Sequence, residues 1–131
     1  MINDLGLKEN VSYTGRLTAD ELAEKMAEAN CFAMCSAIEN HSSTLKEAMT
    51  VGTPCVASYV GGVSEYAENE KNCLLYRYED YEVLAQNICR IFEDKKLREN
   101  LSAQASAKMR AHKEKTDYEE MFEILKDVIS T

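Results

Sequence analysis

Two glutamates, Glu39 and Glu47, have seven residues between them in a polar stretch that follows an apolar run. Ser42 or Ser43 can cap a helix that runs to about Val51, which places Glu39 in the loop before it and Glu47 just over one turn inside. A helix N-terminus offers free N–H groups to an anion, above all phosphate. A carboxylate can accept hydrogen bonds from two sugar hydroxyls. This combination suits a nucleotide-sugar pocket, although two solvated surface carboxylates would give the same spacing.

Strands predicted from short apolar runs would position these residues. Such runs, without polar alternation, predict strands buried on both faces, as in a parallel sheet. They are Cys31–Ser36, Pro54–Tyr59 and Cys73–Tyr76. A further β-prone run, Val11–Thr14, ends at Gly15, and Thr18 with Glu21 predicts a capping box at the start of the next helix.

The second half of the chain predicts helices. Gly61 and Gly62 predict a loop, after which Ser64 would cap a short helix over 65–67. After residue 79 the sequence predicts helices to the end of the chain, with apolar residues at helical spacing. These stripes are Leu84, Ile88, Ile91 and Phe92, then Leu97, Leu101 and Ala105, and finally Met121, Leu125 and Val128 on a terminal amphipathic helix.

Strands that alternate with helices over the first 90 residues indicate an α/β fold, a parallel sheet with helices on both faces. Ligands of such sheets bind beyond the carboxyl ends of the strands. The loops after Ser36, Tyr59 and Tyr76 are therefore the candidate binding region.

Composition excludes several other classes of protein. The chain has 131 residues, enough for one small domain, and a net charge of −8, which disfavours nucleic-acid binding. No apolar stretch approaches the length of a membrane span and the N-terminus is not a signal peptide, so we expect a cytoplasmic chain. The five cysteines are odd in number and form no CxxC pair, which argues against a zinc ribbon and a disulfide framework. Four of the five lie in or beside apolar runs and are expected to be small buried hydrophobes in a reducing compartment.

The segment ENHSSTLKEAMTVGTPCVASYVGGVSE resembles the signature of the retaining family 4 glycosyltransferases of the GT-B fold. That pattern is a Glu, seven residues, Glu-Ala-Met, a Gly-Thr-Pro turn, a buried strand, and Gly-Gly followed by Glu. Its counterparts here are Glu39, 47–49, 52–54, 55–59, and 61–62 with Glu65. The resemblance extends over about residues 3–128 and implies a Rossmann-like, partial C-terminal domain of that fold.

The resemblance assigns roles to individual residues. Glu39 would contact hydroxyls of the donor hexose, and Glu47 would hold the ribose of a UDP- or GDP-sugar. The backbone N–H groups of Ser42, Ser43 and Thr44 would receive the β-phosphate. No metal or other cofactor is implied, and the chain has no Asp-x-Asp motif.

Other positions carry alternatives or departures. Gly61 and Gly62 would either contact the ligand or simply form a turn. Where the family usually has Gly, an aromatic residue and Gly, this chain has Asn40, His41 and Ser42. We interpret His41 as a loop histidine and not as a base or a metal ligand.

The length predicts a single domain. The resemblance implies that residues 1–131 are a partial domain, with a βα core at 3–95 and C-terminal helices at 96–131. The resemblance implies that a missing N-terminal domain selects a glycan or lipid-linked acceptor, so we expect the chain alone to be inactive. The parent enzyme could lie against the inner face of a membrane, and the terminal helix could mediate self-association. A receiver- or flavodoxin-like domain and a non-catalytic interaction module remain alternatives.

Overall fold

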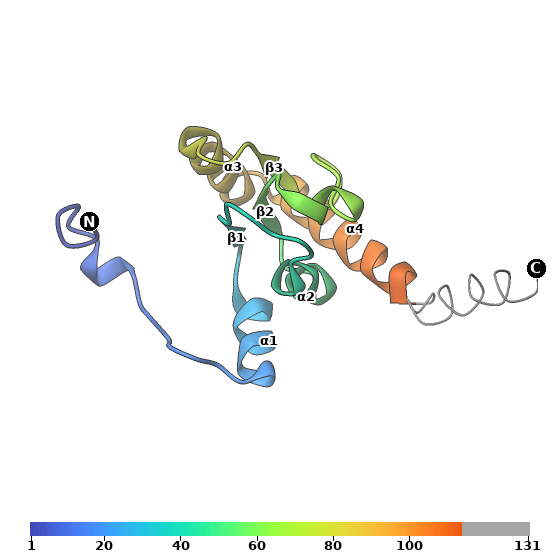
Figure 1. Ribbon diagram of the computed structural model, residues 1–131, viewed down its shortest axis with the longest axis horizontal. Helices are drawn as coiled ribbons and strands as arrows, with labels where there is room; N and C mark the ends of the chain where they lie inside the picture. Colours follow the sequence, from blue (N-terminus) through green and yellow to red (C-terminus); the bar gives the residue numbers. More distant parts are fainter. Residues whose placement is uncertain (114–131) are drawn as a thin grey trace, which may run out of the picture.

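The computed structural model describes residues 1–113, which form a small three-stranded sheet and the helices around it (Figure 1). The elements in chain order are η1 (Lys8–Asn10), α1 (Ala19–Glu28), β1 (Phe32–Met34), α2 (Ser43–Val51), β2 (Cys55–Ser58), η2 (Gly61–Glu65), β3 (Leu74–Tyr76), α3 (Tyr81–Glu93) and α4 (Lys95–Lys113). The three predicted strands are all present, each shorter than its apolar run.

The sheet is parallel throughout, with the strand order β1-β2-β3. Phe32 pairs with Cys55, and Val56 pairs with Leu74. This register places the carboxyl ends of all three strands at one edge of the sheet. The predicted α/β class is confirmed.

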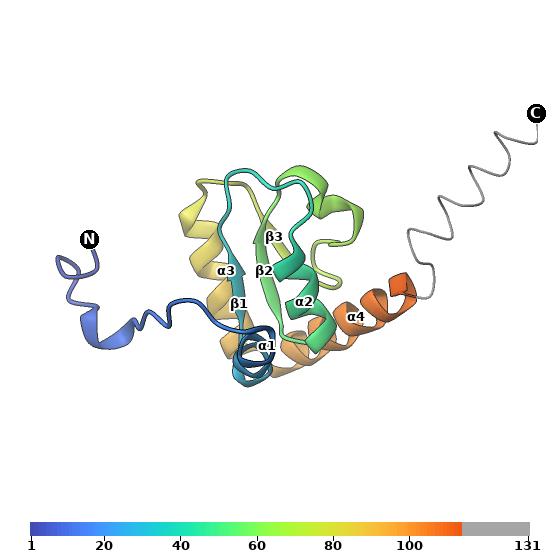
Figure 2. The same cartoon turned by 60° about the horizontal axis from the view of Figure 1, so that its bottom comes forward.

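Helices cover both faces of the sheet, as Figure 2 shows with α2 on one side and α3 on the other. Alternate residues of β2 explain this arrangement, because Cys55 and Ala57 pack toward α1 and α2 while Val56 packs toward α3. Helix α4 closes both layers, since Leu101 belongs to the core on the α3 side and Ala105 to the core on the α2 side.

The predicted caps of α1 and α2 are confirmed. Thr18 accepts a hydrogen bond from the Glu21 N–H, and the Glu21 carboxylate accepts one from the Thr18 N–H, which is a complete capping box. Helix α2 is capped by Ser42 and ends at Gly52, whose φ of 92° lies in the left-handed region that glycine adopts readily.

Two expectations about strands are wrong. Ala33, at the centre of β1, is exposed, because β1 is an edge strand of this sheet and is not buried on both faces. The Val11–Thr14 run forms no strand in the described structure; it is extended and exposed, and the segment before α1 runs away from the sheet in both views. A strand needs a neighbour to pair its backbone groups, and none lies beside this segment.

The expectations of a loop at 61–62, of a cap at Ser64 and of Phe92 in the buried stripe are wrong. Gly61 and Gly62 belong to the short helix η2, which starts after Val60 without a side-chain cap, so Ser64 is not a cap. Phe92 is 55% exposed and lies off the buried stripe, which continues through Ile91. The predicted terminal helix with Met121, Leu125 and Val128 lies outside the described residues.

The burial of the cysteines differs with their position in the fold. Cys55 and Cys73 are buried in the core, Cys31 is half-buried, and Cys35 and Cys89 are exposed. Burial raises the pKa of the Cys73 thiol to about 12. The expectation of small buried hydrophobes is therefore met only within the sheet.

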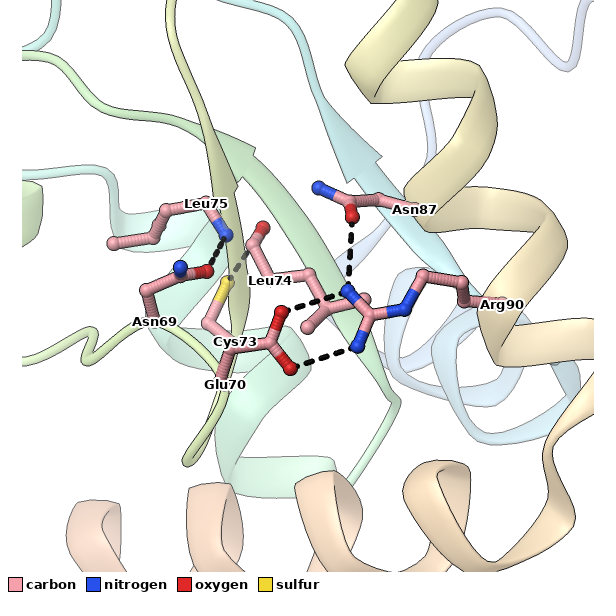
Figure 3. Close-up of polar contacts among 7 residues, drawn as sticks. All are labelled: Asn69, Glu70, Cys73, Leu74, Leu75, Asn87 and Arg90. Atoms are coloured by element: carbon pink, nitrogen blue, oxygen red, sulfur yellow. Dashed lines mark hydrogen bonds and ion pairs between the residues drawn. The ribbon is translucent and has the colours of Figure 1, made fainter.

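The turn before β3 is tied to α3 by polar contacts (Figure 3). Both Arg90 guanidinium nitrogens donate to the Glu70 carboxylate, at 2.7 and 2.8 Å, and one of them also donates to Asn87 Oδ1 at 3.4 Å. The same turn is tied to β3, because the Leu75 N–H donates to Asn69 Oδ1 at 2.8 Å. These contacts fix one end of β3 against its covering helix.

Candidate functional site

The candidate site lies at the edge of the sheet where the loops after β1, β2 and β3 meet (Figure 2). The loop after β1 carries Glu39, which is partly buried. Ser36, the last residue of the predicted first strand, donates its hydroxyl hydrogen to Glu39 Oε1 at 2.9 Å. The Glu39 carboxylate is therefore held by a side chain of its own loop.

The first turn of α2 presents free backbone donors beside this loop. Ser42 is buried, and its hydroxyl accepts a hydrogen bond from the Leu45 N–H at 3.3 Å. The first N–H groups of a helix have no partner within the helix. Ser43 and Thr44 are exposed, and within the described chain their N–H groups have no other partner. Together with the helix dipole, these donors favour an anion.

The two glycines of η2 pack directly on the loop that carries Glu39. The Gly62 N–H donates to the Asn40 carbonyl at 2.9 Å. A Cβ atom added at Gly61 would overlap the Glu39 carbonyl oxygen, and one added at Gly62 would overlap the Asn40 carbonyl oxygen. Both positions thus require glycine for close backbone contact, which explains the Gly-Gly pair without any contact to a ligand.

A second set of contacts joins the loop, α2 and η2. His41 Nε2 lies 3.0 Å from a Glu65 carboxylate oxygen, and its ring is tilted against the Tyr66 ring. The Tyr66 hydroxyl donates to the Ser42 carbonyl at 3.5 Å, and burial raises the pKa of Tyr66 to about 12. Lys46 Nζ lies 4.9 Å from the centre of the Tyr66 ring, a cation–π contact. These contacts join His41 to η2 and Lys46 of α2 to Tyr66.

Glu47 occupies a different position from Glu39. It is exposed and lines a groove of about 590 Å³ between α1 and α2, together with Ser43 and Lys46. Glu39 does not line this groove. The structure thus brings Glu39 together with the glycines and with the capped start of α2, whereas Glu47 faces the neighbouring groove one turn further along the helix.

Sequence reasoning missed Ser36, Ser58 and Tyr66. Ser58 is fully buried at the end of β2 and donates to the Ser36 carbonyl at 2.7 Å. A serine three positions before Glu39 was a usable signal for Ser36. Nothing local signalled Ser58 or Tyr66, because each reaches the site from a distant part of the chain.

No group of three or more His, Cys, Asp or Glu side chains within residues 1–113 has the arrangement of a metal site. In the same part of the chain, no helix is both long enough and apolar enough to cross a membrane.

With this geometry in view, comparison with known proteins identifies the family. The family model of the glycosyl transferases group 1 matches residues 1–108. The chain belongs to this family. The α/β sheet described above is therefore that of a GT-B glycosyltransferase, and the match does not support a receiver- or flavodoxin-like domain.

Similar proteins include other glycosyltransferases. N-acetyl-alpha-D-glucosaminyl L-malate synthase of Bacillus anthracis is 25% identical over 132 residues, which is 97% of this chain and 34% of that enzyme. Sucrose-phosphate synthase from Thermosynechococcus elongatus superposes with a TM-score of 0.80 and 29% identity, covering 84% of this chain and 28% of that one. Anabaena HepE, solved in complex with UDP-glucose, gives a TM-score of 0.78 and 29% identity over 82% of this chain and 29% of HepE. This glycosyltransferase chain spans about a third of the length of these proteins.

Proposed function

We propose that this chain is the donor-binding part of a retaining glycosyltransferase that transfers a hexosyl group from a UDP- or GDP-sugar to a glycan or lipid-linked acceptor. The observation that carries the proposal is the first turn of α2, where the exposed N–H groups of Ser43 and Thr44 lie next to the loop of Glu39. The UDP-glucose complex of HepE, a protein that shares this fold, supports a nucleotide-sugar ligand.

In this proposal each residue has a distinct task. The α2 N-terminus receives the β-phosphate and stabilises the negative charge of the departing diphosphate, without a metal ion. Glu39 accepts hydrogen bonds from hexose hydroxyls, and Glu47 accepts them from the ribose. Gly61 and Gly62 act indirectly, because their close packing holds the Glu39 loop in place.

We further propose that residues 1–131 form part of a C-terminal domain, with the βα core at 3–95 and helices at 96–131. A second domain would supply the acceptor site, in an enzyme of the cytoplasm that acts at the inner face of a membrane. The chain alone should then bind the donor without transferring its sugar. A purified chain that turned over UDP-glucose or GDP-mannose at an enzymatic rate would contradict this part of the proposal.

An amide NMR titration of the chain with UDP and with GDP tests the binding site. We expect shifts concentrated in residues 36–47 with one of the two nucleotides, and weaker binding in Glu47→Ala. Glu93→Ala is the matched control, because Glu93 is also an exposed glutamate on a helix and lies in the last turn of α3, away from the loops. A dispersed spectrum that neither nucleotide shifts would contradict donor binding and favour a non-catalytic interaction module.

A further inference from the structure

Two serine hydroxyls connect β2 to the loop of Glu39, one through the Ser36 backbone and one through the Ser36 side chain. Ser58 is fully buried and donates to the Ser36 carbonyl at 2.7 Å, while Ser36 in turn donates its own hydroxyl to Glu39 Oε1 at 2.9 Å. The first bond fixes the backbone where the loop leaves β1. The second bond reaches the carboxylate itself.

Two further contacts of this loop involve its backbone. The Gly62 N–H donates to the Asn40 carbonyl, and the Gly61 backbone packs on the Glu39 carbonyl. These contacts place the backbone of Glu39. Within residues 1–113 the Glu39 carboxylate accepts one side-chain hydrogen bond, the one from Ser36, and this bond favours the observed position of the carboxylate.

We propose that Ser36 is a positioning residue that prepares Glu39 to bind the hexose of the donor, an inference that rests on the proposed function. A glutamate side chain loses substantial rotamer entropy when it becomes ordered, and a pre-formed hydrogen bond removes part of that cost from the binding step. Ser36 occupies only one acceptor position, on Oε1. An ionised carboxylate has about four such positions, so Oε2 and the remaining lone pairs stay available to sugar hydroxyls.

This role makes a prediction that a purely structural serine would not. Ser36 should affect binding of the sugar and leave binding of the nucleotide unchanged, because the diphosphate lies on α2 and not on Glu39. We expect Ser36→Ala to weaken UDP-glucose or GDP-mannose binding about three- to ten-fold, while the affinity for UDP or GDP changes less than about two-fold. Ser36→Thr keeps the hydroxyl and should restore the affinity for the sugar nucleotide.

Isothermal titration calorimetry of the full 131-residue chain with these four ligands measures the effect. Ser64→Ala is the matched control, since Ser64 is an exposed serine on η2. The decisive measurement is a double-mutant cycle with Glu39→Ala, which removes the acceptor of the Ser36 hydrogen bond. If Ser36 acts through the Glu39 carboxylate, Ser36→Ala causes little further loss in the Glu39→Ala background.

Three outcomes would overturn the inference. Equal weakening of nucleotide and sugar nucleotide would show that Ser36 only maintains the loop. Additive losses in the cycle would show that it acts independently of Glu39. A folded wild-type chain that binds none of the four ligands would refute the proposed function itself, and the inference with it. In that last case the failure is already visible in the wild type, before any variant is measured.

Discussion

Replacement of Gly61 by alanine should displace the Glu39 loop and destabilise the fold. Gly61 has a φ of 51°, in the left-handed region, and its Cα faces the Glu39 carbonyl so closely that an added Cβ would overlap the oxygen. The obstacle is a backbone group, which cannot rotate away as a side chain could. The Gly62 N–H bond to the Asn40 carbonyl, at 2.9 Å, pulls the same two segments together.

The expected cost follows from these two effects. A non-glycine residue in the left-handed region costs about 1–2 kcal/mol. Forcing extra volume into a closely packed contact costs a further ~1–3 kcal/mol. Alanine also lowers the conformational entropy of the unfolded chain, which offsets about 0.4–1 kcal/mol of this destabilisation. We therefore expect Gly61→Ala to lower the free energy of unfolding by about 1–5 kcal/mol, a substantial share of the ~5–15 kcal/mol typical of natural domains.

Urea unfolding followed by circular dichroism measures this cost, and amide NMR shifts report the loop. Gly52→Ala is the matched control, because Gly52 also has a positive φ, of 92°, but its added Cβ would meet Ser102 Oγ, a movable side-chain atom, at 3.2 Å. The control lacks the backbone overlap, so with the same entropy gain it should cost about 0–2 kcal/mol, and it should leave the amides of residues 36–42 unshifted. Equal costs for the two variants, with no shift in that loop for Gly61→Ala, would refute the close packing inferred here.

Three further predictions concern other parts of the chain. Ser42→Ala removes the cap of α2 and should lower the free energy of unfolding by about 1 kcal/mol in the same urea assay. The Arg90 guanidinium lowers the pKa of the Glu70 carboxyl, so the ion pair stabilises the fold at neutral pH and is lost as the pH falls through that lowered pKa. Glu70→Gln should therefore lower the free energy of unfolding by less than about 1 kcal/mol at pH 7. Urea titrations at acidic pH should show no difference between the variant and the wild type, and a difference that persisted at acidic pH would argue against the ion pair. A thiol reagent at pH 8 should label Cys35 and Cys89 rapidly in the native chain, whereas the other three cysteines should react only in denaturant; mass spectrometry distinguishes the two groups.

Local signals in the sequence correctly predicted most of the secondary structure. The Thr18–Glu21 capping box, the Ser42 cap and the Gly52 stop all depend on bonds within one turn of a helix, so residues close in sequence determine them. The apolar runs predicted three parallel strands because burial in such a sheet requires apolar side chains on both faces. The family resemblance relied on the same kind of signal, a series of motifs in a fixed order.

Properties that depend on neighbours distant in sequence were not predictable in this way. An apolar run does not show whether a partner lies on each side of a strand, so the exposed edge of β1 and the unpaired Val11–Thr14 segment were missed. The sequence pattern predicted a loop at Gly61 and Gly62. It did not show why glycine is needed at these positions, which is that their backbone packs against the carbonyl groups of residues 39 and 40.

The candidate site likewise combines features set by the local sequence with features set by tertiary contacts. The sequence by itself determined that Glu39 precedes a capped helix and that Glu47 lies one turn inside it, because loop and helix are continuous in the chain. Only the tertiary structure decided that Ser58, 22 positions after Ser36, anchors the Glu39 loop through the Ser36 carbonyl. A buried hydroxyl must find an acceptor, and the parallel pairing of β1 with β2 is what brings that carbonyl within its reach.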